Sequence, residues 1–221
     1  MLDHRRRYLQ VAFNYDAALV RRLLPSVPQS DRVLIEAGTP YLKREGMDGL
    51  RLIRKMWSGT VVADLKTIDG AQMEVRMAAQ AGANAATALG SSPAEALDFF
   101  VDTCDQAGLA SMIDMLGVKD PLDTLMRMRR PPDVVVLHRG RDEEGTRGKV
   151  IQYRHVNRIR SKFDVIISAA GGVDLKEARS AIFNGAGIVV VNLVAAEDPW
   201  EGISTEADLA AIARKFLDTI E

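Results

Sequence analysis

The stretch VVADLKTIDG, residues 61–70, begins as an apolar run of the kind that forms strands and ends in a glycine. Side chains alternate along a strand, so Asp64 and Lys66 are expected to project from the same face. Asp69 follows where the strand gives way to a turn. Charges inside a buried strand are costly unless they pair or serve a site. The pattern therefore predicts an acid, an ammonium and a second acid at one strand end, as a structural ion pair or as part of a site.

The composition predicts one globular domain, residues 1–221, because the chain is 47% hydrophobic and 27% charged. Its net charge of −1, from 29 basic and 30 acidic residues, favours neither nucleic acid nor an anionic membrane. No apolar run approaches the roughly 18–20 residues that span a bilayer, and no secretory signal is recognisable. The single Cys104 excludes an internal disulfide and is expected to be buried. We therefore expect a cytoplasmic protein.

Short apolar runs alternate with segments of helical periodicity along the whole chain. Strands are expected at residues 8–13, 33–35, 61–65, 84–89, 109–115, 134–137, 165–168 and 188–191. Helices are expected at residues 16–24, 41–56, 71–81, 93–106 with Ser92 as N-cap, 121–128, 149–162, 175–184 and 205–220. Such strands are typical of parallel sheets buried on both faces. Without a G-x-G-x-x-G opening, the regular alternation favours a single (β/α)8 TIM barrel over an open doubly wound sheet.

Polar residues follow the apolar runs, and the active sites of such barrels lie at the carboxyl ends of the strands. The residues in these positions are Asn14, Glu36, Asp64, Lys66, Asp114, His138, Arg141, Gly171, Gly172 and Asn192. His138 alone among the histidines ends an apolar strand, whereas His4 and His155 are expected to face solvent. The basic run at residues 153–160 is interpreted as an amphipathic helix with a solvated basic face and not as a nucleic-acid site.

Residues 62–69, VADLKTID, resemble the D-x-K-x-x-D signature of the orotidine-phosphate decarboxylase suprafamily. The likeness is strongest to the branch that holds 3-hexulose-6-phosphate synthase and 3-keto-L-gulonate-6-phosphate decarboxylase. Four further segments agree in the same order, namely residues 9–12, 35–40, 116–121 and 170–173. The resemblance covers essentially the whole chain and implies the same barrel.

The resemblance also implies roles for the polar residues. Glu36 and Asp64 would bind Mg²⁺, a hard ion that suits two carboxylates plus waters and substrate oxygens. Lys66 would stabilise an enediolate oxygen as its charge develops. His138 would move protons. Asp69 would reach the active site of the partner subunit in a homodimer.

The phosphate end of the site departs from the family pattern at two positions. Gly171 and Gly172 can present backbone N–H groups to a phosphate, although a glycine pair is also common in a plain turn. Asn192 stands where many relatives carry Gly-Arg or Gly-Gly, and Asn14 stands where they generally carry Asp. Either change is compatible with an altered substrate or with lost activity.

Three functions remain open at this point. The leading one is a Mg²⁺-dependent aldol-type lyase that fixes formaldehyde onto ribulose 5-phosphate through an enediolate. The second is decarboxylation of a 3-keto sugar-acid phosphate, which Arg141 favours because it lies three residues after His138. The third is a diverged barrel that binds a phosphorylated ligand without turnover, which Asn14 and Asn192 favour.

Overall fold

A computed structural model describes residues 2–221 of the chain. The strands are β1 (Tyr8–Phe13), β2 (Val33–Ala37), β3 (Thr60–Thr67), β4 (Ala85–Leu89), β5 (Ala110–Asp114), β6 (Val134–His138), β7 (Ile166–Ala170), β8 (Ile188–Val194) and β9 (Ile203–Ser204). The α-helices are α1 (Ala17–Leu23), α2 (Thr39–Met56), α3 (Ala71–Gln80), α4 (Ala94–Ala107), α5 (Pro121–Arg127), α6 (Arg154–Arg160), α7 (Leu175–Phe183) and α8 (Leu209–Thr219). Two 3₁₀ turns, η1 (Leu24–Ser26) and η2 (Arg141–Glu143), follow α1 and β6.

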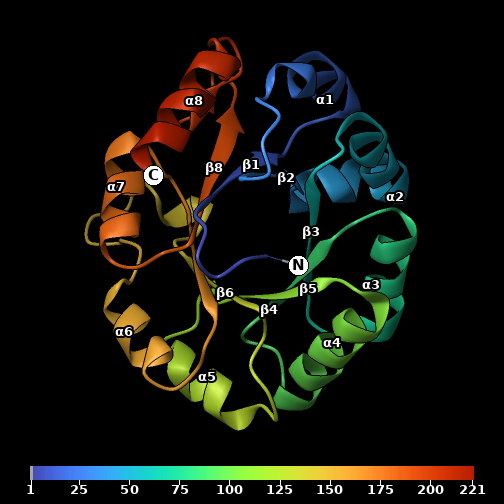
Figure 1. The fold of residues 1–221 in the computed structure, drawn as a ribbon, viewed down its shortest axis with the longest axis vertical. Coiled ribbons are helices and arrows are strands. Elements are labelled where there is room, and N and C mark those ends of the chain that lie inside the picture. The colour runs from blue at the N-terminus through green and yellow to red at the C-terminus, as the bar shows by residue number, and fades with distance from the viewer. Residues whose placement is uncertain (1) are drawn as a thin grey trace.

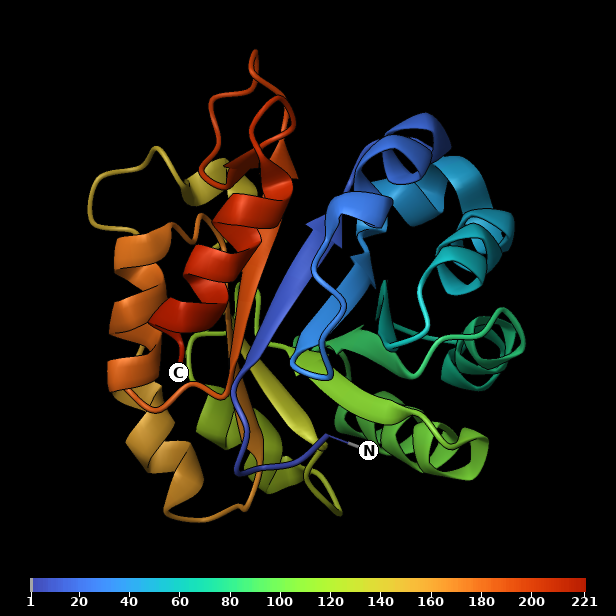
Figure 2. The same ribbon diagram turned by 45° about the horizontal axis from the view of Figure 1, so that its top comes forward.

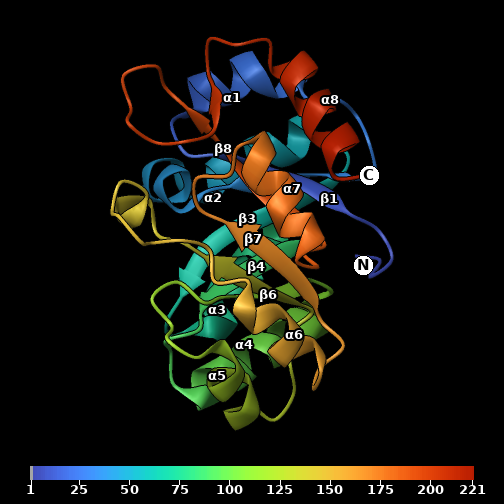
Figure 3. The same ribbon diagram turned by 90° about the vertical axis from the view of Figure 1, so that its left-hand side faces the viewer.

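The strands β1 to β8 pair in parallel and in sequence order, and β1 also pairs with β8. This last pairing closes the sheet into a barrel, and the helices surround it (Figure 1). Figures 2 and 3 show the same ring from two further directions, with α7 and α8 packed outside β8 and β1. The predicted (β/α)8 TIM barrel is therefore confirmed.

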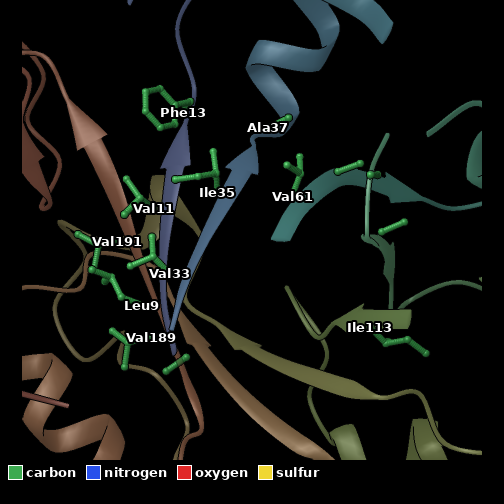
Figure 4. Close-up of a cluster of buried hydrophobic side chains, with 14 of the residues drawn as sticks. Leu9, Val11, Phe13, Val33, Ile35, Ala37, Val61, Ile113, Val189 and Val191 are labelled. Carbon is green, nitrogen blue, oxygen red and sulfur yellow. The ribbon is translucent and has the colours of Figure 1, made fainter. Parts of the chain in front are cut away.

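Strand side chains alternate between two apolar layers. Inward-facing residues such as Leu34, Met112 and Ile188 fill the barrel, and Leu2 packs against this inner cluster. Outward-facing residues form a larger cluster with the helices, part of which is drawn in Figure 4. Because both strand faces are buried, the strands are mostly apolar, and their charged side chains collect beyond the inner cluster, near the carboxyl ends.

The helix expected at residues 149–162 is shorter than predicted and spans Arg154–Arg160. Gly148 has a φ of +83°, and the ammonium of Lys149 donates to Glu143 at 2.5 Å. Ile151 is buried, so the segment before α6 is anchored as a loop. His155 was wrongly predicted to face solvent: it is 3% exposed, because it lies on the inner face of α6.

Two helix starts also differ from the predictions. Pro93, and not Ser92, is the N-cap of α4, and the hydroxyl of Ser92 donates to the carbonyl of Thr67 at 3.5 Å. The helix expected from residue 205 begins at Leu209, where the carboxylate of Asp208 accepts from the Ala211 N–H at 2.9 Å. Ile203 and Ser204, just before the expected start of the helix, pair with β8 as the short strand β9.

Cys104 is fully buried, as predicted. Within residues 2–221, no helix combines the length and the apolar character needed to cross a bilayer.

Candidate active site

A bulge at the end of β3 aims two charged side chains into the barrel mouth. The pairing of β3 with β4 shifts register between Ala63 and Thr67, and Lys66 has a φ of +48°. Among residues 2–221, Lys66 is the one non-glycine residue with positive φ. Such a conformation is strained for a side chain with a Cβ and is found mainly where function requires it. The bulge sets the Lys66 Nζ 3.0 Å from Asp64 Oδ1.

Lys66 contacts a second carboxylate, which comes from β5, two strands along the barrel from β3. Its Nζ lies 2.6 Å from Oδ2 of Asp114, at the end of β5. The same oxygen lies 2.8 Å from Nδ1 of His138, at the end of β6. The ends of β3, β5 and β6 thus bring four side chains into one chain of contacts, namely Asp64, Lys66, Asp114 and His138. The side chain of Asp114 is only 3% exposed, so this acid is buried between the Lys66 ammonium and the His138 ring.

The charges of this cluster stabilise one another. Burial alone would raise the pKa of Asp114, but His138 and Lys66 hold that pKa well below its ordinary value. Burial alone would lower the pKa of Lys66, but Asp64 and Asp114 raise it overall. The pKa of His138 is likewise raised, because Asp114 outweighs burial. Asp114 is therefore a carboxylate, and Lys66 stays charged.

Asp114 orients His138 as well as stabilising its charge. The ring nitrogen Nδ1 faces the carboxylate, which leaves Nε2 as the nitrogen that can exchange a proton with a bound molecule. The sequence placed Asp114 at a strand end but assigned it no role. Its separation of 48 residues from Lys66 explains why the pairing was not visible in the sequence.

Glu36 and Asp64, the predicted metal ligands, both line the same cavity. Burial and the nearby charge of Asp64 raise the pKa of Glu36 to about 7. The amide of Gln10 donates to Glu36 Oε2 at 2.5 Å. Asp64 accepts from the hydroxyls of Thr39 and Thr87 at 2.7 and 2.8 Å. The two acids are thus held in fixed positions and repel each other.

The cavity at the carboxyl ends of the strands has a volume of about 470 Å³. Asn14 and Asn192 line it from β1 and β8, and the Asn14 Nδ2 donates to the Asn192 Oδ1 at 3.0 Å. Arg141 lines it from the loop after β6, with its guanidinium 4.4 Å from the ring centre of Trp200. The sequence analysis assigned no role to Trp200, because only the fold brings the loop after β8 to Arg141.

The two glycines after β7 have different surroundings. Gly171 lines the cavity, and a Cβ on it would lie 1.9 Å from the carbonyl oxygen of Arg139. Gly172 is not among the lining residues, and a Cβ there would lie 2.1 Å from Arg139 Nη2. This guanidinium donates to the carbonyl oxygens of Gly171 and Gly172 at 3.1 and 3.2 Å. A Cβ at Gly171 would thus clash with the backbone, whereas at Gly172 the φ of +60° favours glycine. The phosphate role of the two glycines stays a prediction.

Comparison with known proteins identifies the family. The family model described as "Orotidine 5'-phosphate decarboxylase / HUMPS family" matches residues 7–201. The chain belongs to this family. The match covers every residue of the cluster around Lys66, so the predicted resemblance is confirmed at the level of the family.

Individual relatives of this orotidine 5'-phosphate decarboxylase/HUMPS family member are enzymes. "Bifunctional enzyme Fae/Hps" of Methanothrix thermoacetophila is 34% identical over 97% of this chain, and the match spans 53% of the relative. The chain thus spans about half the length of the curated relatives it matches. A crystal structure of 3-hexulose-6-phosphate synthase superposes with a TM-score of 0.80 at 26% identity, over 97% of this chain and 100% of the other. The synthase from Salmonella typhimurium, at 24% identity and a TM-score of 0.82 over 96% of this chain and 98% of the other, shows the same fold.

Asp69 is the one predicted catalytic residue of this family member that lies away from the cavity. It follows β3, is solvent-exposed, and is not among the residues that line the cavity. Ile68 beside it is 57% exposed, and Met73 in the next turn is 68% exposed. Within one copy of the chain, Asp69 therefore does not join the Lys66 cluster.

Proposed function

We propose that this protein is a carbon–carbon lyase that forms and stabilises an enediolate of a ketose phosphate. The observation that supports it is the buried contact chain Asp64–Lys66–Asp114–His138 at the carboxyl ends of the barrel strands. A charged ammonium fixed in a partly enclosed cavity is suited to stabilise an oxyanion that develops during the reaction. The name of the 3-hexulose-6-phosphate synthase relative supports a hexulose 6-phosphate as the product, and the resemblance in sequence implies formaldehyde and ribulose 5-phosphate as the substrates.

In the proposed reaction, the ketose loses a proton from the carbon next to its carbonyl group. Lys66 donates a hydrogen bond to the oxygen on which negative charge then develops. The enediolate carbon attacks the carbonyl carbon of formaldehyde, and the oxygen of the former aldehyde takes up a proton. His138 is placed to move protons through Nε2, while Asp114 fixes its ring orientation.

Glu36 and Asp64 fit a divalent cation. Burial and then the charge of Asp64 raise the pKa of Glu36, and a cation bound by both acids would offset this repulsion. Two carboxylates that leave room for waters and substrate oxygens suit Mg²⁺. The bound ion would polarise the oxygens of the ketose. Glu36 and Asp64 would hold it, and Gln10 and Thr39 would fix the orientation of these two acids.

Excess EDTA is expected to abolish the formation of hexulose phosphate from ribulose 5-phosphate and formaldehyde, and Mg²⁺ should restore it. Glu36→Gln should weaken Mg²⁺ binding measured by calorimetry, because it removes one of the two ligand charges. The variant should still show the circular dichroism and cooperative melting of the wild type. Undiminished synthesis in excess chelator would show that the reaction needs no metal.

Decarboxylation of a 3-keto sugar-acid phosphate is the second candidate, and Arg141 favours it. Its guanidinium lines the cavity and stacks on Trp200, where it could contact a second anionic group of the substrate. The two reactions pass through the same kind of enediolate, so product analysis on both substrates separates them.

A binder without turnover is the third candidate, which the hydrogen-bonded pair Asn14–Asn192 keeps open. For a working enzyme, the wild type should turn over a sugar phosphate, and Asn14→Asp should not raise its rate. For a binder without turnover, the wild type should be inert on all ketose phosphates and keto-acid phosphates. One of these ligands should still raise its melting temperature.

We also propose a homodimer in which Asp69 serves the partner subunit's cavity. Large apolar side chains are exposed around Asp69 on α3 and on the neighbouring helix α4, which is typical of a protein interface. They are Ile68, Met73, Met77 and Phe99, with exposed fractions of 57%, 68%, 43% and 63%. A second copy on this face would cover them and bring its own Asp69 to the site.

Coexpression of Lys66→Ala and Asp69→Ala chains tests the shared site. Each variant alone should be inactive, whereas the mixture should recover about a quarter of wild-type activity. Half of randomly assembled dimers are mixed, and each mixed dimer contains one intact site. A mixture no more active than its parents, although mixed dimers are isolated by two affinity tags, would contradict the shared site.

A further inference from the structure

Two oppositely charged side chains, Arg139 and Glu144, lie beside the glycine turn after β7, and each has an unsatisfied buried atom. Within residues 2–221, Arg139 Nε and Glu144 Oε1 are buried and have no hydrogen-bond partner. The other carboxylate oxygen of Glu144, Oε2, accepts only from the Glu201 N–H, at 3.0 Å. A buried guanidinium N–H and a buried carboxylate oxygen without partners are both costly. The pair is therefore not a finished structural ion pair.

Both groups lie over the glycine turn after β7. A Cβ placed on Gly172 would lie 2.1 Å from Arg139 Nη2 and 2.9 Å from the carboxyl carbon of Glu144. Glu144 also lines the cavity, as do Gly171 and Arg141. The positive charges of Arg139 and Arg141 both favour the ionised form of Glu144, although burial raises its pKa overall. The Glu144 carboxylate thus lies near Arg139 over the glycine turn, and the charge of Arg141 also acts on it.

We propose that Glu144 is an internal competitor that occupies the position of the substrate's phosphate and has to leave when the phosphate binds between Arg139 and Arg141. This inference rests on the proposed function, because it takes the ligand to be a phosphate monoester. It makes Arg139 the phosphate-binding arginine of this chain. It also makes Glu144 a residue that sets the affinity of the cavity for anions.

The exchange would satisfy both unpartnered groups in one step. A phosphate oxygen between the arginines accepts a hydrogen bond from the Nε–H of Arg139. The displaced Glu144 carboxylate is hydrated, so its unpartnered Oε1 accepts hydrogen bonds from water. The arginine pair is at present balanced by Glu144 and by Glu201, whose carboxylate lies 3.6 Å from Arg139 Nη2. A dianion that entered without displacing Glu144 would face a like charge at contact distance.

Few contacts hold the Glu144 side chain in place, although the loop itself is anchored by Lys149 and Ile151. Residues 145–150 that follow it are all exposed, and the loop contains Gly145 and Gly148. One hydrogen bond, to the Glu201 N–H, holds the carboxylate in place. Arg139, in contrast, is tied to the carbonyl oxygens of both turn glycines and is only 14% exposed in its side chain. Displacement of the acid with retention of the arginine is therefore the expected response to a phosphate.

Calorimetric titration with inorganic phosphate, and separately with ribulose 5-phosphate, tests the proposal. Glu144→Gln should bind both ligands about tenfold more tightly than the wild type, because a like charge no longer competes for the arginines. Glu197→Gln is the control, since it removes the same charge from an exposed residue of the loop after β8 that does not line the cavity. The control should change either affinity by less than about twofold. Glu144→Ala serves as a second variant if the glutamine disturbs the loop.

Unchanged or weaker phosphate binding in folded Glu144→Gln and Glu144→Ala would overturn the proposal, and so would equal tightening in Glu197→Gln. The readout is a binding affinity and does not depend on turnover. If the wild type proves inert but Glu144→Gln binds phosphate more tightly, the proposed function is wrong, whereas the competition between Glu144 and phosphate is supported. If the wild type synthesises hexulose phosphate but Glu144→Gln binds both ligands as the wild type does, the proposed competition is wrong and the proposed function is supported.

Discussion

Lys66→Ala is expected to lower turnover by about a hundredfold or more, because it removes the cation placed to stabilise the developing oxyanion. The ammonium lies 3.0 Å from Asp64 and 2.6 Å from Asp114, so no other side chain of the contact chain can replace it. The loss should appear in kcat more than in KM, since the charge that Lys66 stabilises develops only along the reaction. Steady-state synthesis from ribulose 5-phosphate and formaldehyde measures it.

Lys176→Ala, on the exposed face of α7, is the control and should leave turnover unchanged. Lys66→Arg adds a second comparison, because it keeps the charge between Asp64 and Asp114 but moves its donors. The melting temperature of this variant should be close to that of the wild type, and the variant should still catalyse the reaction slowly. A loss of less than about tenfold in folded Lys66→Ala would make Lys66 a structural residue and would remove the proposed mechanism.

Asp114→Asn is expected to bring the pKa of His138 down below its ordinary value of 6.5. Burial lowers that pKa in the folded protein, and Asp114 is the main group that raises it by its charge and its hydrogen bond. The change is measured by NMR titration of the His138 ring. Turnover should fall as well, because the ring loses the acceptor that orients it. A His138 pKa that stays raised in the variant would show that Asp114 does not control it.

The same substitution should reduce stability most near pH 5. The lowered pKa of Asp114 stabilises the fold above the ordinary value of 3.8, and this contribution is lost as the pH falls through the folded-state pKa. The raised pKa of His138 stabilises the fold below 6.5, and this contribution is lost as the pH rises through its folded-state pKa. Both contributions are present between these limits. Urea unfolding of wild type and variant should differ there by roughly 3 kcal/mol, the cost of breaking a buried ion pair.

The barrel could be predicted from the sequence because its strands are short and apolar on both faces. β1 spans Tyr8–Phe13, as expected, since a run in which Gln10 is the one polar residue lies between Arg7 and Asn14. The helix ends were less accurate where two signals compete. Ser92 and Pro93 both mark the start of α4, and the periodicity of α6 continues into a loop that Lys149 and Ile151 anchor through distant contacts.

The site was predictable as a set of positions but not as a set of contacts. Strand ends identified Glu36, Lys66 and His138, because polar residues there follow apolar runs. The β3 bulge, which depends on pairing with β4, was not visible, and alternation alone gave the right face for Lys66 without its positive φ. The pairing of Arg139 with the turn after β7 and of Arg141 with Trp200 joins loops far apart in the sequence.

Deuterium exchange at C1 of ribulose 5-phosphate tests the central claim most directly. In the proposed reaction, C1 loses a proton to give the enediolate whether or not formaldehyde is present. Wild-type protein incubated in D₂O with Mg²⁺ and ribulose 5-phosphate should therefore incorporate deuterium at C1, which NMR measures over time. In Lys66→Ala, this incorporation should be about a hundredfold slower. A wild type that binds ribulose 5-phosphate but leaves its C1 protons unexchanged, and forms no product with formaldehyde, would contradict enediolate chemistry at this site.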